Sequence, residues 1–173
     1  GVTLVFSPLI ALMRNQVQSH QARGIEIVSA IYSGQPADER EEILARMRAG
    51  KVRLVYIAPE RMRDPQLLAA LTDTEITQVV VDEAHCVSMW GPSFRPDFLY
   101  LPRLFDVIGR RPPVAAFTAT ATPVMRANIT RELNLSSPVE ITASFDRPEL
   151  RFVVYNRHSR YNAIRSKSDR FQT

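Results

Sequence analysis

The stretch from Val79 to Val81, followed by Asp82 and Glu83, constrains the fold more than any other part of the chain. Three β-branched apolar residues run directly into two adjacent carboxylates. A short apolar run bounded by polar residues is typical of a strand buried on both faces, as in a parallel sheet. Ligands of open α/β sheets bind beyond the carboxyl ends of the strands. The sequence therefore predicts a buried strand that presents Asp82 and Glu83 to a crevice.

Neighbouring acids at a strand end suit one kind of chemistry. Asp82 can hold a magnesium ion, directly or through water, while the ion bridges nucleotide phosphates. Glu83 can orient or deprotonate an attacking water. A solvated Asp-Glu pair at a strand end is common in α/β proteins and accounts for the two residues as well. The pair by itself leaves both interpretations open.

The segment 86–98 cannot form a regular helix or strand, because one glycine and two prolines interrupt it. Unusually for a loop, it carries the only Trp of the chain, Trp90, together with Phe94 and Arg95. Aromatic faces stack on nucleic-acid bases of any sequence, and an Arg adds a phosphate contact or a cation–π interaction. The alternative is that Trp90 and Phe94 fill a core beneath the loop, and composition by itself favours that alternative.

Residues 82–98 read DEAHCVSMWGPSFRPDF. They resemble motif II plus the aromatic-rich loop of the RecQ-family DNA helicases, whose pattern is close to DEAHCISQWGHDFRPEY. These helicases are superfamily-two motors with RecA-like domains. Met89, Pro92 and Ser93 stand where the family usually has Gln, His and Asp. The departures leave the motor assignment intact and bear on polar contacts inside the loop.

The same resemblance implies roles for individual residues. Asp82 would hold magnesium through water, and Glu83 would be the catalytic base. Thr118 and Thr120 lie in a TATA sequence that matches motif III of the family. They would help to bind the nucleotide and, with the catalytic-site residue His85, would couple the nucleotide state to DNA. The implied cofactors are ATP and Mg²⁺.

Two further stretches resemble the DNA-contacting motifs of the family. VFSPLIALMRNQV is similar to motif Ia, and YIAPERM is similar to motif Ib, with Ala58 in place of the frequent Thr or Ser. In motif Ia, a strand-to-helix turn offers helix amino-terminal N–H groups to a DNA phosphate, although an ordinary βα turn explains the same residues. The candidate DNA contacts are Ser7, Pro8, Arg14, Gln16, Pro59, Arg61, Trp90, Phe94 and Arg95.

Length and composition bound the class of protein. A chain of 173 residues fits one domain with a sizeable core. No apolar run approaches the ~20 residues that span a bilayer, and no signal-peptide pattern opens the chain. We therefore expect an intracellular protein, in the bacterial nucleoid or the nucleus, with no membrane partner. The single cysteine, Cys86, excludes an internal disulfide and should pack as a small apolar residue.

The net charge of +4 is unevenly distributed. Residues 147–173 carry seven Arg or Lys against two acids, a net charge of +5, so residues 1–146 sum to −1. The basic excess thus lies in the tail, and nucleic-acid affinity of the body must come from local groups.

Apolar periodicity and Gly or Pro punctuation predict alternating strands and helices. Thr122 reads as an N-cap with Pro123 at the first helical position. The predicted strands are 2–6, 28–32, 52–58, a central strand ending at Val81, 114–117, 139–143 and 151–155. The predicted helices are 9–22, one opened by Pro36 and stopped at Gly50, 67–71, 100–108 and one after Thr122.

The expected fold class is α/β: a RecA-like, P-loop NTPase-type, mostly parallel sheet with helices on both faces. The chain contains no GxxxxGK[ST] phosphate loop. We therefore expect a partial first motor domain over residues 1–146, incomplete at the N-terminus. Residues 147–173 would be a connector, similar to the family's SFxRPNLxY, and a basic tail towards a second motor domain.

The predicted function of the full-length protein is ATP-dependent, 3′–5′ DNA unwinding of the RecQ type, with roles in repair and recombination. Its partners would be single-stranded and partly duplex DNA. The fragment alone is expected to be inactive and to self-associate through an exposed sheet edge. The alternative is a helicase-like module that binds DNA or a partner without hydrolysis. A DEAH-type RNA helicase is disfavoured by the WGxxFRP loop.

Overall fold

The computed structural model describes residues 1–88, 95–143 and 150. The chain divides into two compact units, Gly1–Pro138 and Val139–Thr173. The strands and helices below all belong to the first unit. The predicted domain boundary after residue 146 stays a prediction, and the predicted strand 151–155 lies outside the described residues.

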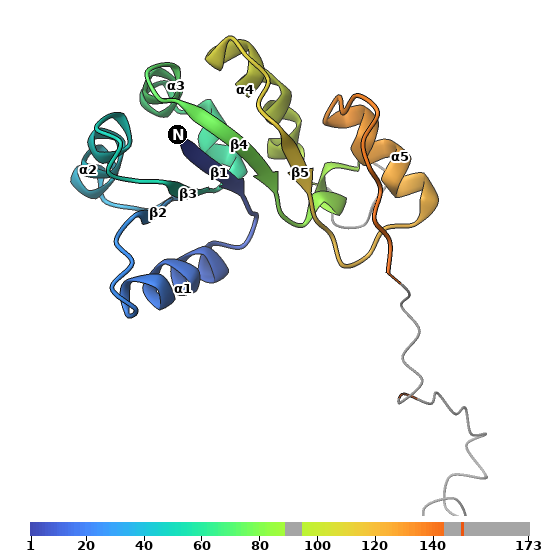
Figure 1. Ribbon diagram of the computed structural model, residues 1–173, viewed down its shortest axis with the longest axis horizontal. Coiled ribbons are helices and arrows are strands. Elements are labelled where there is room, and N and C mark those ends of the chain that lie inside the picture. The colour runs from blue at the N-terminus through green and yellow to red at the C-terminus, as the bar shows by residue number, and fades with distance from the viewer. Residues whose placement is uncertain (89–94, 144–149, 151–173) are drawn as a thin grey trace, which may run out of the picture. The chain divides into compact units, whose positions relative to one another are not determined.

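Strands and helices alternate along the first unit, as the apolar pattern predicts (Figure 1). Most ends fall within one or two residues of the predicted ones. Three short 3-10 turns, η1, η2 and η3, occupy Pro59–Arg63, Ala84–Val87 and Pro96–Tyr100. The strands are β1 Val2–Phe6, β2 Val28–Ile31, β3 Leu54–Ile57, β4 Ile76–Val81 and β5 Val114–Ala116. The helices are α1 Ile10–Gln21, α2 Ala37–Arg48, α3 Pro65–Thr72, α4 Leu101–Ile108 and α5 Pro123–Glu132.

The five strands form one sheet in the order β2-β3-β1-β4-β5, and every neighbouring pair is parallel. The central strand β1 aligns Phe6 with Ile57 of β3 and with Val81 of β4, and Val81 aligns with Ala116 of β5. Because all strands run the same way, their carboxyl ends meet at one edge of the sheet. The residues that follow β1, β4 and β5 therefore lie side by side.

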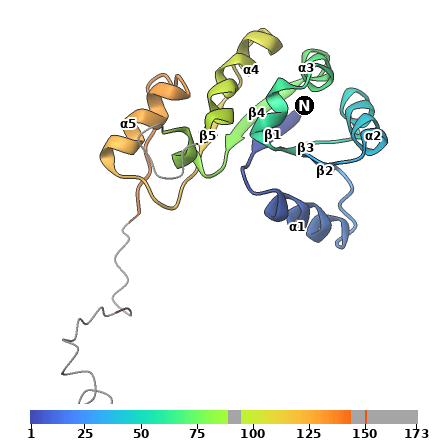
Figure 2. The same cartoon turned by 180° about the vertical axis from the view of Figure 1, so that it is seen from behind.

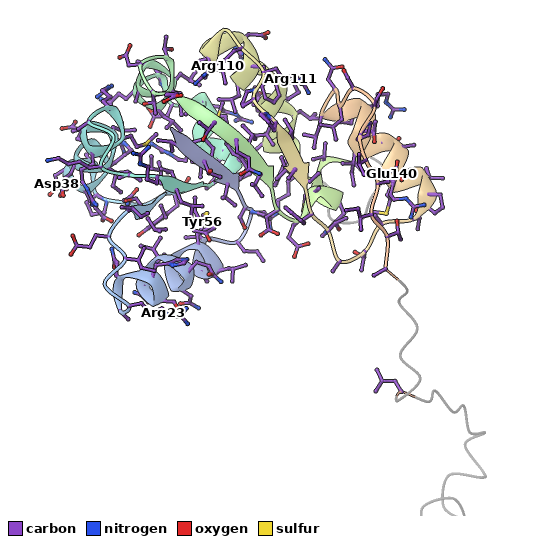
Figure 3. The ribbon with its side chains drawn as sticks, viewed as in Figure 1. Arg23, Asp38, Tyr56, Arg110, Arg111 and Glu140 are labelled. Atoms are coloured by element: carbon purple, nitrogen blue, oxygen red, sulfur yellow. The ribbon has the colours of Figure 1, made fainter. Side chains whose placement is uncertain are left out.

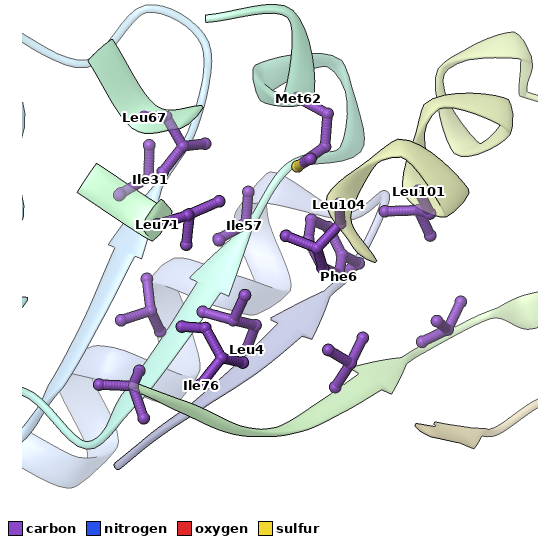
Figure 4. Packing of buried hydrophobic residues seen from close by; sticks show 14 of the residues in the cluster. Leu4, Phe6, Ile31, Ile57, Met62, Leu67, Leu71, Ile76, Leu101 and Leu104 are labelled. Atoms are coloured by element: carbon purple, nitrogen blue, oxygen red, sulfur yellow. The ribbon is translucent and has the colours of Figure 1, made fainter. Parts of the chain in front are cut away.

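The main core lies on one face of the sheet, under α2, α3, α4 and α5. Leu4 and Phe6 of β1 are fully buried there and pack among aliphatic side chains from the helices (Figure 4). Burying one such side chain stabilises the fold by ~1.5–3 kcal/mol. This face therefore holds the central strand, and with it the strand ends, in place.

The other face of the sheet carries α1, which lies opposite α2, α3 and α4 (Figures 1 and 2). Its buried cluster is small: Met13 of α1 packs against Ala30 and Ala58, with Tyr32 and Tyr56 partly buried around them. Helices thus cover both faces, and the predicted α/β fold class is confirmed.

Helix α5 begins as the sequence predicts. Thr122 precedes the helix in extended conformation, and its hydroxyl accepts a hydrogen bond from the Met125 amide at 3.3 Å. Pro123 occupies the first turn, where it loses no helical hydrogen bond. The N-cap prediction is confirmed.

The prediction of a strand at 139–143 is wrong, since these residues form no regular element. Val139 is 89% exposed and Ile141 is 93% exposed. Alternating apolar residues favour a strand only when a neighbouring strand supplies hydrogen bonds and a face to cover. Within the described residues, none of the five strands of the sheet extends its ladder to this segment.

Candidate active site and nucleic-acid interface

Asp82 lies at the carboxyl end of β4 and is held from two sides. Its backbone N–H donates to the Phe6 carbonyl at 2.9 Å, which continues the ladder between β4 and β1. Its Oδ1 accepts the Glu83 amide at 2.9 Å, and its Oδ2 accepts the Ser7 hydroxyl at 3.1 Å. The half-buried carboxylate keeps further lone pairs for a ligand in front of the strand ends.

Glu83 turns the chain sharply after the strand. Its φ of 50° lies in the left-handed region, which a non-glycine residue adopts at a cost of order 1–3 kcal/mol. Ala84 opens the short turn η2, and its N–H donates to the Phe117 carbonyl at 2.8 Å. This hydrogen bond across to the end of β5 holds the turn, so the direction of the Glu83 side chain is set by the sheet.

His85 joins Glu83 to the end of β5. The His85 Nδ1 lies 3.1 Å from the Glu83 Oε2 and 3.0 Å from the Thr118 Oγ1. The Thr118 hydroxyl also donates to the Thr120 carbonyl at 3.3 Å and accepts the Thr120 amide at 3.3 Å. A continuous polar chain therefore runs from the second acid to the TATA turn. We call Ser7, Asp82, Glu83, His85 and Thr118 the strand-tip cluster.

The Asp82 carboxylate of the strand-tip cluster could serve as one ligand of a hydrated magnesium ion. Within residues 1–88, 95–143 and 150, no three His, Cys, Asp or Glu side chains gather to hold a metal. Mg²⁺ usually takes one or two carboxylates and completes its shell with waters and substrate phosphates. Asp82, with a fixed carboxylate at an open strand end, meets that requirement.

Two hydrogen bonds hold Arg95, which follows Trp90 and Phe94 in the chain. Its amide donates to the Cys86 carbonyl at 3.0 Å, and its Nη1 donates to the Pro8 carbonyl at 3.4 Å. Burial raises the pKa of the Cys86 thiol, although the positive charge of Arg95 opposes the shift. Cys86 is a free, buried cysteine, and its predicted packing role is confirmed. The predicted sites Trp90 and Phe94 lie outside the described residues.

The residues of motif Ia separate into two groups. Ser7 is only 1% exposed, and its hydroxyl is directed to Asp82. Arg14 and Gln16 are exposed on α1, and Pro8 is half-buried in the turn before that helix. No side chain caps the start of α1 among the described residues. We call Pro8, Arg14, Gln16 and Arg95 the α1 surface.

The motif Ib residues lie in the turn η1 after β3. Pro59 is buried, and the half-buried Arg61 forms an ion pair with Asp64, which Arg40 also approaches to 3.6 Å. Arg61 is therefore committed to a local ion pair, whereas Arg14 stands free of any salt bridge to described residues.

Three features of the site escape sequence reasoning. The first is the Ser7–Asp82 contact, which depends on β1 and β4 being neighbours. The second is Tyr56, which lies on the α1 side of the sheet (Figure 3) and whose pKa is raised by burial and then by the charge of Asp82. The third is buried Asn128, whose Nδ2 donates to the Ser88 hydroxyl at 3.2 Å. The only sequence feature that points to this last contact is a polar residue, Asn128, at a buried position of α5.

A sequence model of the DEAD/DEAH box helicases matches residues 1–127. The chain belongs to this family. It is 38% identical over 154 residues to the ATP-dependent DNA helicase RecQ of Pasteurella multocida, which covers 89% of this chain and 24% of that protein. It is 34% identical over 188 residues to the RecQ of Bacillus subtilis (98% and 32%) and 42% identical over 154 residues to the ATP-dependent DNA helicase Q5 of Rattus norvegicus (86% and 15%). The resemblance to RecQ helicases is confirmed, and the chain spans less than a third of each of these three relatives.

Among solved structures, the fold is similar to the helicase domain of Pyrococcus furiosus Hef. The TM-score is 0.57 at 18% sequence identity, over 78% of this chain and 27% of that one. This likeness supports the helicase-type RecA-like architecture. Within the described residues, the helices are too short or too polar to cross a membrane.

Proposed function

We propose that this chain forms part of the first motor domain of a RecQ-type DNA helicase. In the whole protein, ATP hydrolysis would drive movement 3′ to 5′ along single-stranded DNA and unwind partly duplex DNA, inside the cell. The observation that carries the proposal is the strand-tip cluster. Asp82 and Glu83 leave β4 between Ser7 of the β1 end and Thr118 of the β5 end, where α/β sheets bind ligands.

Within the cluster, the two acids have separate tasks. Asp82 would hold Mg²⁺ through water, and the ion would supply positive charge next to the ATP phosphates. Glu83 orients the attacking water and takes its proton. His85 keeps the Glu83 carboxylate in place through the 3.1 Å contact at its Oε2. A base that is held in position loses less entropy when it reaches the transition-state geometry.

Coupling to DNA uses the second contact of the His85 Nδ1, the one with Thr118. A change at the Glu83 end moves the hydrogen bond between His85 and Thr118, and Thr118 is also bonded to the Thr120 backbone. The hydroxyl groups of Thr118 and Thr120 therefore report the nucleotide state to the loop before α5. In this proposal they also contact the nucleotide side of the site.

DNA binds along the α1 surface. The uncapped N–H groups at the start of α1 and the exposed Arg14 suit a phosphate backbone. Arg95 sits beside Pro8 through the 3.4 Å hydrogen bond, so this surface extends to the base of the aromatic-rich segment. Trp90 and Phe94 would stack on bases. Pro59 and Arg61 would add contacts from η1.

The two edges of the sheet differ in a way that supports self-association of the isolated chain. At the β2 edge, the Gln35 side-chain amide donates to the outward Ala30 carbonyl at 3.1 Å. At the β5 edge, the Pro113 carbonyl and the Phe117 amide bond to β4, which leaves the backbone N–H and C=O groups of Val114 and Ala116 directed away from β4. Open edges invite pairing with another chain, so two copies would meet at β5.

DNA-stimulated ATPase of the longest natural chain that contains this segment tests the proposal. We expect hydrolysis that requires Mg²⁺ and rises with single-stranded DNA, and no hydrolysis by residues 1–173 alone. A long chain that binds DNA but never hydrolyses ATP would instead support the helicase-like binding module.

A further inference from the structure

Ser7 is the one member of the strand-tip cluster that is almost fully buried. It follows the central strand β1, its amide donates to the Ile57 carbonyl at 3.2 Å, and its side chain points along the edge to Asp82. A buried hydroxyl that lacked a hydrogen-bond partner would destabilise the fold, so a serine at this position depends on the bond to Asp82. If only packing mattered at position 7, alanine would fill the site as well as serine does.

The Ser7 hydrogen bond completes the fixation of the Asp82 carboxylate. The Glu83 amide binds Oδ1 from within the same turn, and Ser7 binds Oδ2 from the neighbouring strand. One bond leaves the carboxylate free to rotate, whereas two bonds on different oxygens fix its plane. Hydrogen bonds to a charged acceptor are also stronger than those between neutral groups.

We propose that Ser7 is a positioning residue for Asp82, which sets the carboxylate in the orientation that receives Mg²⁺ and its nucleotide. The inference rests on the proposed function. It moves Ser7 from the DNA-contacting group to the metal-binding side of the site. Groups that orient a metal ligand typically change metal affinity 10–100-fold when they are removed.

The test measures how much Mg²⁺ the protein needs. In the longest natural chain, Ser7→Ala should raise the Mg²⁺ concentration for half-maximal binding of a fluorescent ATP analogue about tenfold. Binding of the analogue without Mg²⁺ and DNA binding should stay as in wild type. ATPase at saturating Mg²⁺ should largely recover. A residue that only supported the fold would lower all of these together.

Matched variants separate orientation from packing. Ser29→Ala removes another buried serine, on β2, which β3 and β1 separate from β4, and should leave the Mg²⁺ requirement unchanged. Ser7→Thr keeps a hydroxyl donor, so its Mg²⁺ requirement should be close to that of wild type. If Ser7→Ala fails to fold, Ser7→Cys replaces it, because a thiol has similar shape but donates weakly.

The outcomes distinguish this inference from the proposed function. If wild type hydrolyses ATP and Ser7→Ala or Ser7→Cys needs no more Mg²⁺ than wild type, the inference is wrong and the function stands. If wild type shows no Mg²⁺-dependent nucleotide binding at all, the proposed function fails and the inference fails with it.

Discussion

The strand-tip cluster and the α1 surface are neighbours at one edge of the sheet, yet they are built differently. In the cluster, Asp82 and His85 are each engaged by two partners within 3.1 Å. On the α1 surface, Arg14 and Gln16 are exposed. The Arg14 guanidinium lies over the ring of Tyr32, 6.0 Å from the ring centroid.

This difference matches two kinds of task. Proton transfer and metal binding demand groups fixed within a fraction of an ångström, so their side chains are held by the ends of β1, β4 and β5. Contact with a phosphate backbone demands accessible charge that follows a flexible polymer. Substitutions in the cluster should therefore act on chemistry, and substitutions on the surface should act on salt-dependent affinity.

The largest effect is expected from Glu83→Gln. Glutamine keeps the shape and the contact with His85 but cannot accept a proton, so ATPase should fall ~10²–10⁴-fold while nucleotide still binds. Steady-state ATPase and nucleotide titration of the longest natural chain measure both. Glu75→Gln, an exposed acid just before β4, is the control and should be near wild type. A Glu83→Gln protein with more than about a tenth of wild-type turnover would remove Glu83 from the base role.

Thr118→Val tests whether the polar chain carries the coupling. The change removes the hydroxyl that contacts His85 and keeps the side-chain shape, so DNA stimulation of ATPase should fall about 2–10-fold, the worth of one net hydrogen bond. The matched control is Thr77→Val, which loses a hydrogen bond to the Val2 carbonyl near the start of β4. Equal stimulation ratios in the two variants would contradict a role for Thr118.

Arg14→Ala tests whether the α1 surface binds DNA. Loss of one phosphate contact should weaken binding of single-stranded DNA a few-fold and reduce the slope of log affinity against log salt by ~0.7. ATPase without DNA should not change. Arg23→Ala, an exposed arginine beyond the other end of α1 (Figure 3), is the control. An unaltered salt slope would exclude Arg14 from the contact surface.

The smallest effect concerns Cys86, which follows His85 of the strand-tip cluster and whose carbonyl accepts the amide of Arg95 from the α1 surface. Its raised pKa leaves less thiolate at pH 8, so a thiol reagent should react more slowly with the folded chain than with the urea-unfolded chain. The same shift contributes stability that is complete below the unfolded pKa of ~8.5 and is lost as pH rises through the folded value. Equal reaction rates in both states would show that the thiol is not protected.

Sequence reasoning succeeded where local pattern decides the outcome. The Val79–Val81 run predicts β4, and the Thr122-Pro123 pair predicts the start of α5. It failed at 139–143, where alternation is present but no strand forms. Isolated patterns report what a segment can bury and cannot report whether a partner is there.

The partners inside the candidate site were equally out of reach. That Ser7 faces Asp82 follows from the strand order, and strand order is a property of the whole sheet. Sequence reasoning grouped Ser7 with its chain neighbours Pro8 and Arg14, whereas the structure joins it to a residue 75 positions away. Motif membership thus identified the residue, and only the three-dimensional arrangement indicates what it touches.

Position 83 is where stability and reactivity make opposite demands. Its left-handed backbone favours glycine or asparagine, so a sequence selected for thermal resistance alone would give up the carboxylate there. Glu83→Asn is accordingly a change that should raise the melting temperature while ending turnover. Consensus-style stabilisation of this domain would need to exempt that one residue, because its conformational penalty is the cost of keeping an acid at the turn.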